Sequence, residues 1–159
     1  MANELRVSRS GAREIHAERF FDASRDRVWQ AFTDPELIPQ WWGQRSTTTI
    51  VETMDVRPGG NWRFVQRSDD GTETGFSGEF RELNEPESLT WTFSWDGNPG
   101  QASIETVTFT ERDGGTLVKS VSVFESEKDR DDMLDYGMEA GMAETYDRLE
   151  ELLAKVSAS

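Results

Sequence analysis

Hydrophobic and polar residues alternate through most of the region between residues 47 and 124, a pattern that predicts consecutive β-strands. The expected strands lie near residues 47–57, 61–68, 73–83, 88–95, 102–112 and 116–124. Turn-forming Gly, Pro, Asn and Asp residues separate them. Large aromatic residues occupy one side of the alternation, and Thr, Ser and charged residues occupy the other. The pattern indicates an antiparallel sheet with one face buried and one face in water.

Shorter elements precede these strands. Residues 14–21 predict a further strand, and Ser24 is placed to cap a short helix over residues 25–32. The Asp34–Pro35 pair is a second helix-start signal, because proline favours the first helical position. It predicts another short helix from Pro35 through Ile38.

The C-terminal region has helical periodicity. Ser126 can cap this helix, and acidic residues follow it in the first turn. Apolar or small residues then recur at steps of three and four, including Leu134, Met138, Gly141, Met142, Thr145, Leu149 and Leu152. We therefore expect one helix of roughly seven turns that lays this stripe on the aromatic face of the sheet.

Composition supports a single globular domain over residues 13–156, preceded by a polar, flexible leader over residues 1–12. The 159-residue chain has no apolar run near the roughly 18 residues that span a bilayer, and its N-terminus has no secretory pattern. Cysteine is absent, which excludes a disulfide scaffold, a thiol nucleophile and a thiolate metal site. A cytoplasmic location is the simplest expectation.

The net charge of −14 is unevenly distributed. Basic and acidic residues cancel up to Arg45, whereas the region from Ser46 onward has 10 basic and 24 acidic residues. Such a surface repels phosphate backbones and anionic lipid headgroups, so nucleic-acid binding and membrane insertion are not expected. Arginine supplies 14 of the 17 basic residues, a bias that either a GC-rich genome or a salty cytoplasm would produce.

Several segments, in their order along the chain, resemble START-like (SRPBCC) domains. They are Arg19–Ala23, Val28–Leu37, Gln40–Gly43, Pro58–Phe64, Gly78–Leu83, Pro86–Thr92, Gly115–Leu117 and Gly141–Leu152. The branch most similar to this chain is named after the C-terminal domain of the activator of the heat-shock protein 90 ATPase. The resemblance covers about residues 13–154. Where family members often have tryptophan after the helix glycine, this chain has Met142.

The resemblance implies an α+β, helix-grip (START/Bet v 1-like) fold. In this fold a curved antiparallel sheet of about six to seven strands wraps around a long C-terminal helix, with two short helices after the first strand. It also implies a cavity between sheet and helix, used in relatives for lipids, polyketides, flavonoids or other ring systems.

The residues support such a cavity independently. Any one of the aromatic residues can be explained as part of an ordinary core. The helix expected to face them has Gly137 and Gly141 on its apolar side, and these two residues leave side-chain volume empty opposite the aromatic rings. The expected cavity residues are Trp41, Trp62, Phe64, Phe76, Phe80, Trp91, Phe93, Trp95, Met138 and Met142. The methionines would adapt to ligands of varied shape.

Three functions remain open: binding of a hydrophobic or aromatic small molecule, a cyclase-like or hydrolase-like enzyme, and a co-chaperone of the heat-shock protein 90 ATPase. Glu79 and Glu82 are candidates to hold a polar group of a ligand, although a solvated face also explains them. The single histidine, His16, has no evident catalytic or metal-binding partner. The sequence therefore assigns no catalytic residue, metal site or cofactor. An apolar small molecule is the expected partner, and a chaperone or a second copy docked through sheet edges is also compatible with the sequence.

Overall fold

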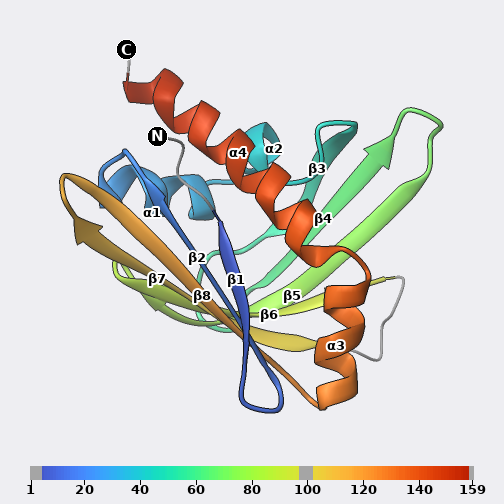
Figure 1. Ribbon diagram of the computed structural model, residues 1–159. Helices are drawn as coiled ribbons and strands as arrows, with labels where there is room; N and C mark the ends of the chain where they lie inside the picture. Colours follow the sequence, from blue (N-terminus) through green and yellow to red (C-terminus); the bar gives the residue numbers. More distant parts are fainter. Residues whose placement is uncertain (1–4, 97–101, 158–159) are drawn as a thin grey trace.

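Eight antiparallel strands form one curved sheet, and the last helix crosses its concave face (Figure 1). The computed structural model describes residues 5–96 and 102–157. The strands are β1 (Arg6–Ser10), β2 (Glu14–Phe21), β3 (Thr47–Met54), β4 (Asn61–Ser68), β5 (Glu73–Asn84), β6 (Ser88–Trp95), β7 (Ser103–Arg112) and β8 (Gly115–Phe124). The helices are α1 (Arg25–Thr33), α2 (Ile38–Trp41), α3 (Glu127–Asp135) and α4 (Met138–Ser157).

The strand order is β1-β2-β8-β7-β6-β5-β4-β3. Strands β3 to β8 follow one another as neighbours, and β2 closes the series by pairing with β8. Helices α1 and α2 connect β2 to β3 across the width of the sheet. This arrangement confirms the α+β helix-grip fold, and each strand expected between residues 47 and 124 is present within three residues of its expected bounds.

The N-terminal region differs from the expected flexible leader. Residues 6–10 form β1, which pairs with β2 so that Val7 lies opposite Ala17. Gly11 allows the turn between the two strands, because its φ of +57° is in the left-handed region. Most of β1 is exposed, so its strand character comes from hydrogen bonding to β2 and leaves little hydrophobic signal in the sequence. Residues 1–4 lie outside the described residues.

The two short helices are present, but the second begins later than expected. Ser24 caps α1, with its Oγ accepting from the backbone N–H of Arg27 at 3.4 Å. Asp34 instead makes a local turn, because its Oδ1 accepts from the backbone N–H of Glu36 at 2.9 Å. Helix α2 consequently starts at Ile38, three residues after the proline.

The C-terminal segment is two helices where one was expected. Ser126 caps α3 through a 3.0 Å hydrogen bond from the backbone N–H of Asp129. Gly137 then takes a φ of +86°, which ends α3 and allows α4 to start in a new direction (Figure 1). The buried Arg130 fastens α3 to the start of β2 and to the β1–β2 turn, because its Nη1 donates to the carbonyls of Glu14 at 3.1 Å and Gly11 at 3.5 Å.

Helix α4 is buried in the core along its C-terminal part, whereas its first two turns are more exposed. Its buried residues are Tyr146, Leu149, Leu152 and Leu153, which join the core beneath α1 and α2. From Met138 to Thr145 every residue is half-buried or exposed. The core therefore fills the concave face under the C-terminal part of α4 and leaves space under its first two turns.

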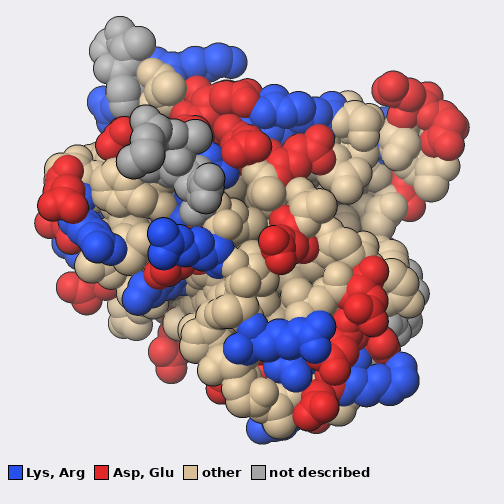
Figure 2. Space-filling model, in the orientation of Figure 1, with Lys and Arg blue, Asp and Glu red and all other residues tan. Residues whose placement is uncertain are grey.

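The surface over α3 and α4 is rich in acidic residues interspersed with basic residues (Figure 2). Arg45 pairs with Glu151 across the α2–α4 contact, and Arg63 pairs with Glu52 at 3.0 Å on the outer face of the sheet. Such exposed pairs add little to stability, on the order of 0–1 kcal/mol each. Within the described residues, no helix is both long enough and apolar enough to cross a membrane.

Candidate functional site

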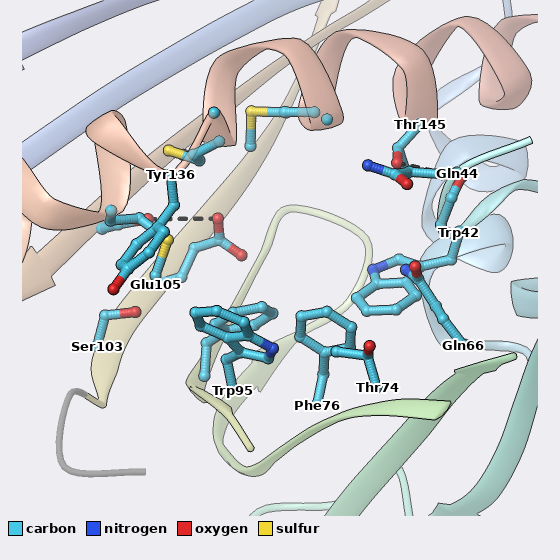
Figure 3. Close-up of a pocket in the computed structure, with 18 of the residues that line it drawn as sticks. Trp42, Gln44, Gln66, Thr74, Phe76, Trp95, Ser103, Glu105, Tyr136 and Thr145 are labelled. Atoms are coloured by element: carbon cyan, nitrogen blue, oxygen red, sulfur yellow. Dashed lines mark hydrogen bonds between the residues drawn. The ribbon is translucent and has the colours of Figure 1, made fainter. Parts of the chain in front are cut away.

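A cavity of about 430 Å³ lies between the inner face of the sheet, the end of α2 and the α3–α4 turn (Figure 3). Its walls differ in character. Strands β4, β5 and β6 provide aromatic rings, α3 and α4 provide methionine and glycine, and two groups of polar residues line opposite ends. The volume is within the roughly 300–1,000 Å³ of small-molecule sites.

The aromatic wall is one continuous set of packed rings. The centroid of Trp62 lies 5.3 Å from that of Trp91 and 5.8 Å from that of Phe93. Phe93 in turn packs on Phe76 at 5.7 Å, and Phe76 packs on Trp42 at 5.1 Å. The first three pairs are tilted by 38–39°, and the Phe76–Trp42 pair is edge-to-face, at 77°. All four centroid distances are within the range of favourable ring contacts, so the wall is a continuous apolar surface.

A glycine in β5 permits this close packing. A Cβ atom at Gly78 would lie 1.8 Å from the carbonyl oxygen of Thr92 and 2.7 Å from Nε1 of Trp62. No side chain fits there, so the strand backbone itself supports the Trp62 ring.

Eight of the ten residues expected at the cavity line it: Trp41, Trp62, Phe76, Trp91, Phe93, Trp95, Met138 and Met142. Phe64 and Phe80 do not, because both are completely buried behind the wall. Phe64 packs against Trp62 at 4.7 Å, and Phe80 packs against Trp91 at 5.7 Å. They share the inner face, as the alternation predicted, but they support the lining rings from behind.

The helical wall has open space. Met133 of α3 and Met138 and Met142 of α4 line it, together with Gly141. A Cβ atom at Gly141 would meet no atom within 4 Å outside its own helix and neighbours. The absent side chain therefore contributes directly to the volume of the cavity.

One end of the cavity is polar, and its main feature is Glu105 of β7. Trp91 Nε1–H donates to Glu105 Oε1 at 2.6 Å, and Ser122 Oγ donates to Oε2 at 3.4 Å. Figure 3 shows the carboxylate turned into the cavity, with Ser103 and Tyr136 beside the same end. Burial raises the pKa of Glu105 above its ordinary value, and the hydrogen bonds from Trp91 and Ser122 offset part of that rise.

Tyr146 lies close enough to Glu105 for the carboxylate charge to affect the pKa of the Tyr146 hydroxyl. Its side chain is buried, and its ring meets those of Phe21 and Phe32 edge-on, at 5.6 and 6.4 Å. Burial raises the pKa of Tyr146, and the negative charge of Glu105 raises it further. Tyr146 therefore stays a neutral hydroxyl at this wall of the cavity.

The opposite end lies beside the Trp42–Gly43 corner, where the polar lining residues are Gln44, Thr47, Gln66, Ser68, Thr74 and Thr145. Arg148 Nη1 donates to the carbonyl of Gly43 at 3.0 Å, and Thr145 Oγ1 donates to the same oxygen at 3.4 Å. These bonds tie α4 to the corner and fix the width of the cavity at this end (Figure 3).

The two carboxylates considered from sequence do not reach the cavity. Glu79 and Glu82 are absent from its lining, and Glu79 pairs with Arg81 at 2.8 Å. Glu105 was missed, although alternation backward from Phe109 and Val107 places it on the inner face. The apolar Ile104 beside it, which is 44% exposed, conceals this pattern because it faces outward. Among the described residues, no group of three His, Cys, Asp or Glu side chains is placed to hold a metal ion.

Comparison with known proteins agrees with this architecture. The family model described as "Activator of Hsp90 ATPase homolog 1-like protein" matches residues 22–154. A crystal structure of a protein from Mycobacterium smegmatis is 27% identical, with a TM-score of 0.85 over 94% of this chain and 97% of that one. A solution structure from Arthrobacter aurescens is 25% identical, with a TM-score of 0.86 over 94% and 91% of the two chains.

A crystal structure of a protein from Rhodobacter sphaeroides has a TM-score of 0.90 over 96% of this chain and 99% of that one. At 24% identity, this likeness shows the fold alone. No curated protein matches the chain.

Proposed function

We propose that this chain, which belongs to the family of Activator of Hsp90 ATPase homolog 1-like proteins, binds a hydrophobic or aromatic small molecule in the cavity between its sheet and its C-terminal helices. Membership in the family supports a ligand-binding or co-chaperone-like role in general. The cavity favours ligand binding, and a lipid, polyketide or flavonoid is the class of compound that suits it.

One observation carries the proposal: a cavity of about 430 Å³ is lined by packed rings on one side and by a glycine with no neighbouring side chain on the other. A core selected only for stability would be filled, because interiors pack to the density of organic crystals. Here Gly141 keeps volume open in the first turn of α4, where glycine costs up to about 1 kcal/mol in helix propensity relative to alanine. We infer that the open volume is retained for a ligand.

The experiment is a titration with fatty acids, flavonoids, polyketide-like aromatics and aromatic amines, followed by tryptophan fluorescence. Trp42, Trp62, Trp91 and Trp95 all line the cavity, so a bound ring should quench or shift their emission. If no compound in the panel changes the emission, the binding proposal is wrong.

Two variants of α4 locate the site. Gly141→Phe places a ring in the cavity and should weaken binding at least about tenfold, equivalent to about 1.4 kcal/mol. Ala140→Phe is the matched control, because Ala140 is exposed on the same helix and does not line the cavity. Far-ultraviolet circular dichroism establishes that both variants are folded. Equal loss of affinity in the two variants would place the ligand elsewhere.

Glu105 favours a second candidate, a cavity-based enzyme. A carboxyl group with a raised pKa in an apolar site can give a proton to a bound substrate or take one from it. If the protein is an enzyme of this kind, incubation with a bound polyketide-like or ester ligand should yield a cyclised or hydrolysed product. Glu105→Gln should then abolish product formation while the ligand still binds. Recovery of the ligand unchanged from the native protein would exclude the reaction tested.

A further inference from the structure

The charged side chain at the cavity is acidic, with no basic side chain beside it in the lining that the structure describes. Among the described residues that line it, Glu105 is the single carboxylate, and none is Lys, Arg or His. The tyrosines Tyr136 and Tyr146 are the other titratable side chains in the lining. A ligand in this cavity therefore meets one acidic group and no basic side chain.

Glu105 is oriented by neutral donors only. The indole N–H of Trp91 and the hydroxyl of Ser122 each bind one carboxylate oxygen, at 2.6 and 3.4 Å. A carboxylate has about four acceptor positions, so hydrogen-bonding capacity remains after these two bonds. Figure 3 shows the group turned toward the cavity, where a ligand would use that capacity.

A buried cation does lie on the same face of the sheet, but it is held by other groups. Arg19 of β2 lies opposite Val118 of β8, four residues along that strand from the Ser122 that faces Glu105. Its guanidinium binds Asp147 at 2.7 Å and Glu150 at 3.2 Å, both on α4. The charge of Arg19 is therefore directed to the helix acids.

Aromatic rings surround the remaining approach to Glu105. Trp91 and Phe93 are on the adjacent strand, and Trp95 meets Tyr136 edge-to-face at 5.4 Å beside the same end (Figure 3). The faces of such rings attract cations, most strongly where water is excluded. The net charge of −14 adds a long-range potential of the same sign as Glu105, which attracts cations and repels anions.

We propose that the cavity selects ligands that carry a protonated amine on an apolar or aromatic body, with the ammonium group bound to Glu105 and the body against the rings of β5 and β6. The inference rests on the proposed binding function and narrows its ligand class. It predicts discrimination against carboxylate ligands such as fatty acids, because a second carboxylate beside Glu105 would be repelled without any cation to compensate it.

The test is isothermal titration calorimetry at neutral pH with three probes that share one ring system: 1-naphthylmethylamine, 1-naphthalenemethanol and 1-naphthoate. The amine should bind at least about tenfold more tightly than the alcohol, because its positive charge adds coulombic attraction to the hydrogen bond that both probes can make with the Glu105 carboxylate. The carboxylate should bind most weakly.

Glu105→Gln removes the charge while it keeps the shape of the side chain. In this variant the affinity of the amine should fall to that of the alcohol, and the affinity of the alcohol should stay within about twofold of the native value. Glu82→Gln is the matched control, because it makes the same change in net charge at an exposed residue outside the cavity. It should leave all three affinities unchanged.

The outcomes separate this inference from the binding proposal. Equal binding of amine and alcohol to the native protein, or an amine preference that survives in Glu105→Gln, overturns the inference while ligand binding stands. The order of the three probes on the native protein decides the matter even if the variant does not fold. If none of the probes binds and the wider panel also fails, both proposals are wrong.

Discussion

Gly137 and Gly141 lie four residues apart where α3 meets α4, and alanine at the two positions should change stability in opposite directions. A Cβ atom at either position would meet nothing within 4 Å, so steric clash with neighbouring segments is absent from both comparisons. The difference between them is the backbone. Gly137 has a φ of +86°, whereas Gly141 lies within α4.

The magnitudes follow from this difference. Alanine at Gly141 improves helix propensity and restricts the unfolded chain, which should raise the free energy of unfolding by about 0.5–1 kcal/mol. Alanine at Gly137 must adopt a left-handed conformation, which costs about 1–2 kcal/mol and is only partly offset by the same effect on the unfolded chain. For a chain of this length, 1 kcal/mol corresponds to about 2–4 °C in Tm.

Urea unfolding followed by tryptophan fluorescence and by circular dichroism measures both variants. The two probes should give one transition, and the slope of free energy against urea should stay constant so that midpoints report stability. Gly141→Ala should move the midpoint up, and Gly137→Ala should move it down. A shift of the same sign and size in both variants would contradict the assignment of Gly137 as the break between two helices.

Two further predictions concern the walls of the cavity. Gly78→Ala should destabilise the protein by about 2 kcal/mol or more in urea unfolding, because its Cβ would overlap the carbonyl of Thr92 and displace the Trp62 ring; an unchanged midpoint would show that β5 and β6 are farther apart than described. Burial raises the pKa of Glu105 in the folded state, so the folded protein keeps the proton on Glu105 to higher pH than the unfolded chain does. The free energy of unfolding should therefore fall as pH rises from 4.5 through the pKa of the folded state. Glu105→Gln lacks this loss, so its stability relative to the native protein should rise between pH 4.5 and neutrality, and a constant difference across that range would contradict a raised pKa.

The parts of the fold that the sequence predicted well are those with a regular burial period. The alternation of large hydrophobic with polar residues located strands β3 to β8, and burial follows this alternation most clearly in β8, where every second residue from Thr116 to Phe124 is buried. The element it missed, β1, pairs through backbone hydrogen bonds with little burial, and periodicity carries no information on such pairing. The break at Gly137 was missed for a related reason, because the apolar stripe continues at helical spacing across a residue whose backbone changes direction.

The apolar part of the cavity was also predictable, whereas its polar end was not. Alternation identifies which rings face inward, but it cannot distinguish Phe64, which is buried behind the wall, from Phe76, which lines it. That difference depends on tertiary packing, because the rings of Trp42 and Trp62 pack on Phe64 at 5.1 and 4.7 Å. To predict Glu105 from the sequence, one would have to place a carboxylate on the inner face of β7 and the apolar Ile104 on the outer face. The hydrophobicity of these two residues alone favours the reverse placement.

The difference in burial between the two ends of α4 has a consequence for how the sequence of this protein can change in evolution. Leu149, Leu152 and Leu153 are buried in the core, whereas Met138 and Met142 line the cavity and are only partly buried, Met142 at the edge of the core. Replacements at Met138 and Met142 should therefore change the shape of the cavity at little cost to the stability of the fold. Under the proposed function, ligand specificity can change through these cavity-lining side chains, while the remainder of the helix stays constrained by its core residues.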